Sequence, residues 1–269
     1  MASQTAAIPL RRIAREQAAL AALLVALAVV CWWITDRRMD GMAMGPTVDL
    51  GGLGFYAGVW AVMMAAMMFP SVWPIVGMYE RIREARAVPV VGTALVVVGY
   101  LATWTAWGVL AFGVIRLAHA LFGNFLPWDG AGRWVAASVV LVAAIYQMTP
   151  LKNACLTRCR GPVMFVMENW RPGLGGAFRM GAVHGAWCVG CCWGLMAALF
   201  ALGVMSIGWM AAIAALIAVE KLLPSRFLAN WSVTVVLLVL GIALLVDPSA
   251  VPGMPDTGGG SHMQMQMMR

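Results

Sequence analysis

Apolar residues in this chain occur in long runs, and short segments between the runs carry nearly all of the charge. A helix needs roughly 20 such residues to cross a bilayer. Seven runs come close to that length, the fourth and sixth being the shortest; they are 17–34, 53–76, 90–117, 134–148, 181–203, 206–220 and 231–246. The pattern predicts an all-α fold, a polytopic membrane helix bundle of about seven transmembrane helices, with six as the alternative.

The composition agrees with a membrane protein. Hydrophobic residues make up 62% of the chain and charged residues 11%, whereas a soluble domain carries roughly 25% charged residues. The net charge of +7 does not indicate nucleic-acid binding, because the basic residues lie at the ends of apolar runs and form no separate basic patch. We therefore expect the lipid bilayer as a partner, and no nucleic acid.

The basic residues also predict an orientation, since cytoplasmic loops are enriched in lysine and arginine. With the N-terminus inside, the cytoplasmic segments hold thirteen of the 18 lysines and arginines. This favours a cytoplasmic N-terminus and an outside C-terminus. The expected organisation is a cytoplasmic segment at 1–16, a transmembrane helical domain at 17–247 and a flexible Met-rich tail at 248–269.

One stretch of the fifth run, HGAWCVGCCWGLM, concentrates soft metal donors on an apolar helix. The donors follow i, i+4, i+7, i+8 spacing and therefore share one helix face; they are His184, Cys188, Cys191 and Cys192. Gly190 and Gly194 fall on a different stripe, which suits close packing against another helix. Packing alone would not require thiol and imidazole groups to be separated from the small residues.

Two further segments are expected near the same membrane depth. TPLKNACLTRCRGP predicts a short helix with Thr149 as N-cap, ending at Gly161. Cys155 and Cys159 would lie on one face of that helix. The second run contains MMAAMMFP, with methionines in its cytoplasmic half; they are Met63, Met64, Met67 and Met68. Donors from three segments are thus expected to meet near the cytoplasmic face.

Thiolate and thioether sulfur select soft ions. The methionines favour copper as Cu(I), and zinc is the alternative, held by cysteines with His184 in place of one of them. Two other interpretations stay open. Cys188 and Cys191 have the CxxC spacing of a membrane thiol-disulfide oxidoreductase, and the cysteines of a non-catalytic scaffold subunit would merely pack. No nucleotide loop, hydrolase elbow or HExxH motif is present, so we do not expect an enzyme.

Together, VMMAAMMFPS, YQMTPLKNACLTRCRGP and MGAVHGAWCVGCCWGLM resemble a bacterial family of predicted metal-binding integral membrane proteins, a domain-of-unknown-function family, over roughly residues 55–246. The resemblance implies a multi-pass protein of the bacterial inner membrane. The family motif falls on Met63, Met64, Met67, Met68, Pro70, Lys152, Cys155, Cys159, His184, Cys188, Cys191 and Cys192. We expect binding of a soft metal ion in transport, delivery or homeostasis, with a metallochaperone or membrane metalloenzyme as partner.

Two weaker expectations complete the sequence picture. Methionines in the first external loop and in the tail could capture metal outside the cell; they are Met39, Met42, Met44, Met263, Met265, Met267 and Met268, with His262. At the end of the sixth run Glu220 is followed by Lys221, which predicts an ion pair between these neighbours at the membrane boundary.

Overall fold

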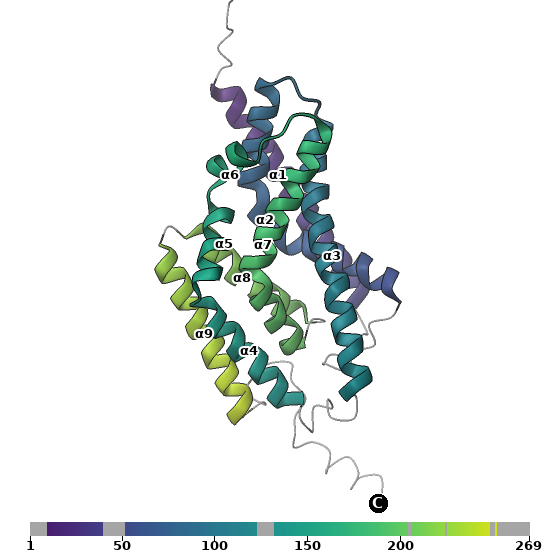
Figure 1. The fold of residues 1–269 in the computed structure, drawn as a ribbon, viewed down its shortest axis with the longest axis vertical. Helices are drawn as coiled ribbons and strands as arrows, with labels where there is room; N and C mark the ends of the chain where they lie inside the picture. The colour runs from purple at the N-terminus through teal and green to yellow at the C-terminus, as the bar shows by residue number, and fades with distance from the viewer. Residues whose placement is uncertain are drawn as a thin grey trace, which may run out of the picture.

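The computed structural model describes residues 10–39, 52–122, 132–203, 206–223, 225–247 and 251. Within these ranges the chain forms nine helices and no strand (Figure 1). The helices are α1 (Leu10–Met39), α2 (Leu53–Ala85), α3 (Val91–Phe122), α4 (Arg133–Gln147), α5 (Pro150–Arg160), α6 (Pro162–Asn169), α7 (Gly173–Gly203), α8 (Ile207–Leu222) and α9 (Arg226–Val246). The predicted all-α bundle is confirmed.

Five helices are long and apolar enough to cross a membrane, namely α1, α2, α3, α7 and α9. The α4–α5 pair, bent by 68°, adds a sixth if it is one broken span. The sixth apolar run forms α8, which has 16 residues and is therefore about 24 Å long, shorter than the roughly 30 Å hydrocarbon core. The count by length and composition is thus five or six rather than seven. The expected orientation of the termini stays a prediction.

Helix α7 runs through the middle of the molecule, between α3 on one side and α4 with α5 on the other (Figure 1). The α3 and α7 backbones touch at glycines. A Cβ on Gly181 would lie 1.9 Å from the Val96 carbonyl oxygen, and one on Gly99 would lie 2.2 Å from the Phe178 carbonyl oxygen. Because only hydrogen fits at these positions, the glycines set the spacing of this helix pair.

The bend between α4 and α5 has a local cause. Thr149 has an extended backbone and its side chain accepts a hydrogen bond from the Lys152 backbone N–H, while Pro150 occupies the first turn of α5. Such an N-cap starts a new helix in a new direction. Gly161 ends α5, and Pro162 begins α6. The short helix predicted from the sequence is confirmed at both ends.

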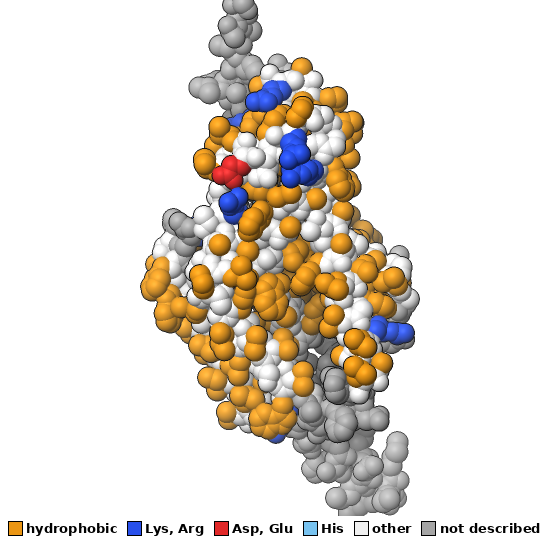
Figure 2. Space-filling model, viewed as in Figure 1, with side chains coloured by type: hydrophobic (Ala, Val, Ile, Leu, Met, Phe, Trp, Pro, Cys, Tyr) orange, Lys and Arg blue, Asp and Glu red, His pale blue; other side chains and the backbone are white. Residues whose placement is uncertain are grey.

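Many large apolar side chains are exposed on the surface, as expected of a bundle that faces lipid. On the face drawn in Figure 2, most of the visible lysine and arginine side chains gather towards the end where α7 begins. Exposed apolar residues lie on helices all around the bundle; they include Val29, Leu110, Val142 and Val239. This distribution is compatible with a membrane protein whose basic end lies outside the hydrocarbon core.

Candidate metal centre

Three thiols meet at the middle of α7. The Sγ atoms of Cys188, Cys191 and Cys192 all lie within 4.8 Å of one another, and those of Cys191 and Cys192 are 3.3 Å apart. All three residues are buried. Their i, i+3, i+4 spacing turns them to one side of the helix. Within the described part of the chain, this is the group of three donors that could hold a metal ion.

Helix α5 adds a fourth sulfur. The Cys191 thiol donates to Cys159 Sγ across 3.7 Å, so cysteines from α5 and α7 meet as the sequence predicted. Cys155 lies one turn earlier and packs at Gly190, where an added Cβ would come within 2.8 Å of its Sγ. Cys155 is therefore beside the three-thiol group rather than part of it. The Tyr146 hydroxyl donates to the Gly190 carbonyl oxygen at 2.6 Å and ties α4 to the same turn.

A lysine from α8 reaches the thiols. Lys221 Nζ lies 3.1 Å from Cys188 Sγ and donates to Ser71 Oγ at the same distance. The Tyr100 hydroxyl is also 3.1 Å from Cys188 Sγ. Sequence reasoning missed all three of these neighbours. Cys188 is therefore the one cysteine of the group with a cationic partner and a phenol within hydrogen-bonding distance.

The expected ion pair between Glu220 and Lys221 is wrong. Glu220 is buried and pairs with Lys152 of α5, with Nζ and Oε1 separated by 2.5 Å. Consecutive helix residues point about 100° apart, so these neighbours serve two different clusters. Two features of the sequence point to the pairing of Glu220 with Lys152: opposite charges stand together at the end of an apolar run, and Lys152 lies in the motif of α5.

His184 lies one turn before Cys188 and is buried. Its ring stacks on Tyr100 at 5.6 Å and meets the edge of Phe165 at 5.1 Å. Its Nδ1 atom has no hydrogen-bond partner among the residues that the structure describes; an unsatisfied buried polar atom costs about 1–3 kcal/mol. His184 stands outside the three-thiol group, but it packs against Tyr100, whose hydroxyl lies 3.1 Å from Cys188 Sγ. Its role as a metal ligand stays a prediction.

The four methionines of the α2 segment MMAAMMFP, Met63, Met64, Met67 and Met68, are all buried. Met68 is linked to the thiol site through Ser71, whose Oγ accepts a hydrogen bond from Lys221 Nζ and lies 4.0 Å from Met68 Sδ. Binding of metal by Met63, Met64, Met67 or Met68 stays a prediction.

The proposed outer capture residues from 40 to 44 and from 262 to 268 lie outside the described residues, and of Met39 only the backbone is described.

The spacing of the sulfur atoms fits one soft ion. Metal–sulfur bonds are about 2.3 Å long, so three sulfurs around one ion lie about 4.0 Å apart. The three Sγ atoms lie between 3.3 Å and 4.8 Å from one another, so shifts of less than about 1 Å would bring them around an ion. Fold and site together define a helical, membrane-compatible protein with a buried group of three thiols that could hold a metal ion.

Comparison with known proteins places the chain within a family. The profile of the family described as "PpoB2: Copper chaperone" matches residues 57–244, which is more than half of the chain. The chain therefore belongs to this copper chaperone family. The matched region includes every residue of the thiol cluster. Among curated proteins and among solved structures, no match is found.

Proposed function

We propose that this protein binds Cu(I) within the membrane on the thiolates of Cys188, Cys191 and Cys192, and passes it to an acceptor protein. The observation that carries the proposal is the convergence of these three buried thiols within 4.8 Å. Membership of the copper chaperone family favours copper among the soft ions that thiolates select.

The charge of the site supports an anionic metal complex. Cu(I) held by three thiolates carries two negative charges overall, and such a complex is costly to bury without a counter-charge. Lys221 Nζ lies 3.1 Å from Cys188 Sγ, where an ammonium group would compensate part of that charge. Zinc on the same three thiolates would carry one negative charge overall, which the ammonium group would also compensate, so zinc is the alternative that metal analysis must test.

The arrangement also suits delivery. Copper moves between proteins when an incoming thiol replaces an outgoing one. Cys159 lies 3.7 Å from Cys191 but on a different helix, which provides an additional thiol at the edge of the group. We propose a metallochaperone or a membrane metalloenzyme as the acceptor, and the bacterial inner membrane as the location. Transport of the ion across the membrane is included in the same proposal.

Metal analysis of the purified full chain tests the proposal. Under reducing conditions the protein should contain close to one copper ion per chain, and Cys188→Ser with Cys192→Ser should lose it. Cys31→Ser is the matched control, because Cys31 lies on α1 and belongs to no thiol cluster. Zinc in place of copper would contradict the assignment of the ion. Thiols that cycle under oxidant without binding metal would favour the oxidoreductase alternative.

A further inference from the structure

A second polar cluster lies close to the thiol site, between α4, α5 and α8. Lys152 Nζ donates to Glu220 Oε1 at 2.5 Å and to the side-chain oxygen of Gln147. All three residues are buried. Ionisable groups inside a membrane bundle are costly and are functional candidates by default. The metal proposal does not use this ion pair.

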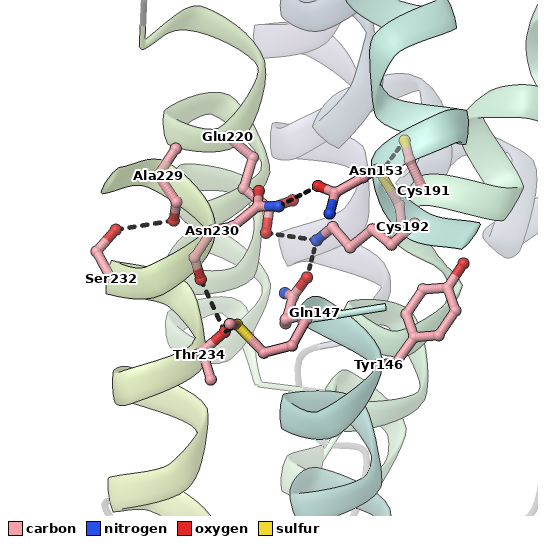
Figure 3. Close-up of polar contacts among 12 residues, drawn as sticks. Tyr146, Gln147, Asn153, Cys191, Cys192, Glu220, Ala229, Asn230, Ser232 and Thr234 are labelled. Carbon is pink, nitrogen blue, oxygen red and sulfur yellow. Dashed lines mark hydrogen bonds and ion pairs between the residues drawn. The ribbon is translucent and has the colours of Figure 1, made fainter. Parts of the chain in front are cut away.

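A cavity of about 430 Å³ reaches this cluster from the surface. It lies between α4, α5 and α9 and is lined by Gln147, Met148, Asn153, Phe227, Asn230 and Trp231. Figure 3 shows Gln147, Glu220, Asn153 and Asn230 gathered at this place. Asn153 and Phe227 are exposed, so the cavity is open to the outside.

The polar atoms at this cavity indicate that water enters it. Among the described residues Asn230 Oδ1 is buried and has no hydrogen-bond partner, and the Gln147 amide lines the same cavity. Buried polar atoms of this kind are normally satisfied by ordered water. The amide of Gln147 therefore connects a wet cavity on one side with the Lys152 ammonium on the other.

The ion pair and the thiol site share the same two helices. Helix α5 carries both Lys152 and Cys159, and helix α8 carries both Glu220 and Lys221. Arg160 adds a second link, since its guanidinium donates to the Glu220 backbone oxygen at 3.0 Å and to the Leu223 backbone oxygen. The contact between α5 and α8 therefore sets how Cys159 and Lys221 are placed around the thiols.

We propose that Glu220 is a proton-binding site that controls metal release. A proton from water in the cavity binds the Glu220 carboxylate, and Lys152 keeps its own proton and its bond to Gln147. Loss of the carboxylate charge removes the ionic attraction between α5 and α8, and the thiol site loosens. The charged side chains around Glu220 are Lys152 and Arg160 on α5 and Lys221 on α8; α4 and α9 contribute the neutral Gln147 and Asn230.

Copper affinity measured against pH tests this inference, which rests on the proposed function. In Glu220→Gln the carboxylate is permanently neutral, so near neutral pH its Kd for Cu(I) should be at least tenfold weaker than that of the wild type. The two Kd values should converge as pH falls, because the wild-type carboxylate then becomes neutral too. A ratio that stays constant with pH, or equal affinities throughout, would overturn the proposal.

Two matched variants distinguish this effect from a general loss of folded structure. Replacing a buried ion pair by apolar residues is often neutral for stability, so Lys152→Met with Glu220→Met should fold and bind copper. Its affinity should fall less steeply with acid than that of the wild type, since only thiol protonation remains; an equally steep fall contradicts the proposal. Glu168→Gln removes an exposed carboxylate paired with Arg158 and should behave as wild type.

A readout without metal distinguishes this inference from the proposed function. Hydrogen exchange of α5 amides in the metal-free protein should be faster in Glu220→Gln than in wild type or Glu168→Gln at the same pH. Unchanged exchange in α5 would show that the ion pair does not hold this helix. If the wild type binds no copper but α5 responds as expected, the proposed function fails and the proton-sensitive contact stands.

Discussion

The two sides of α7 differ in what they place against their neighbours. Towards α3, Gly181 and Gly99 bring main chains into direct contact, with no room for a side chain. Towards α5 and α8, the same helix presents cysteines; Cys191 Sγ lies 3.3 Å from Cys192 Sγ and 3.7 Å from Cys159 Sγ of α5. Apart from Tyr100, whose hydroxyl reaches Cys188 Sγ, the α3 side is a close-packed frame. The other side holds polarisable groups that a small ion can draw together.

This contrast shows how one apolar helix serves two purposes. The α3 contact is reinforced by the Thr103 hydroxyl, which lies 3.1 Å from the Ala182 carbonyl oxygen. A rigid contact on this side fixes the direction in which the cysteines point. The opposite side relies on side-chain contacts through Lys221 and Cys159, which can rearrange when an ion binds. Substitutions on each side should therefore have different effects.

The largest loss of stability is expected on the α3 side. In Gly181→Ala the new Cβ would lie 1.9 Å from the Val96 carbonyl oxygen, and a backbone atom cannot rotate away. We expect a loss of about 3 kcal/mol or more, measured by thermal unfolding in detergent. Gly113→Ala is the control, because a Cβ there has open space, and its helix propensity should be better by up to about 1 kcal/mol. Equal melting temperatures for the two variants would disprove backbone contact between α3 and α7.

A change on the thiol side should affect binding more than stability. Lys221→Met removes the ammonium group 3.1 Å from Cys188 Sγ. Charge-assisted hydrogen bonds contribute about 1.5–3 kcal/mol, so the Kd for Cu(I) should weaken roughly tenfold to a hundredfold. Lys221→Arg keeps the charge and should retain most of the affinity in the same competition titration. Full affinity in Lys221→Met would mean that the bound complex needs no counter-charge.

The smallest effect is expected at the edge of the thiol group. In Gly190→Ala the new Cβ would meet Cys155 Sγ at 2.8 Å, but a thiol can turn away, so the cost should be about 1 kcal/mol. Adding Cys155→Ala should recover that stability. Copper affinity should change less than about threefold in both variants. A large loss of copper in either variant would place Cys155 among the metal ligands, so that the site would extend along α5.

Much of the site could be predicted because it is local. Thr149, Pro150 and Gly161 mark the ends of α5 by their own conformational preferences. The spacing of the cysteines on α7 places their thiols on one face of any helix. The shared depth of the two segments predicts that Cys159 lies near the α7 cysteines, and its contact with Cys191 confirms this prediction.

What could not be predicted depends on contacts between distant segments. Nothing local to Lys221 shows that it faces Cys188, 33 residues earlier, or that Glu220 faces Lys152, 68 residues earlier. Helix α8 looked like another span by its composition, but its length of 16 residues depends on where the chain turns.

The sequence by itself determined the all-helical bundle, the short capped helix and the shared face of the α7 cysteines, because hydrophobic runs, caps and helical periodicity act over a few residues. Only the tertiary structure decided which cysteines lie next to each other, which lysine joins them and which carboxylate pairs with which cation. These depend on how closely the helices approach and how they are rotated, and the glycine contacts between α3 and α7 help to set both.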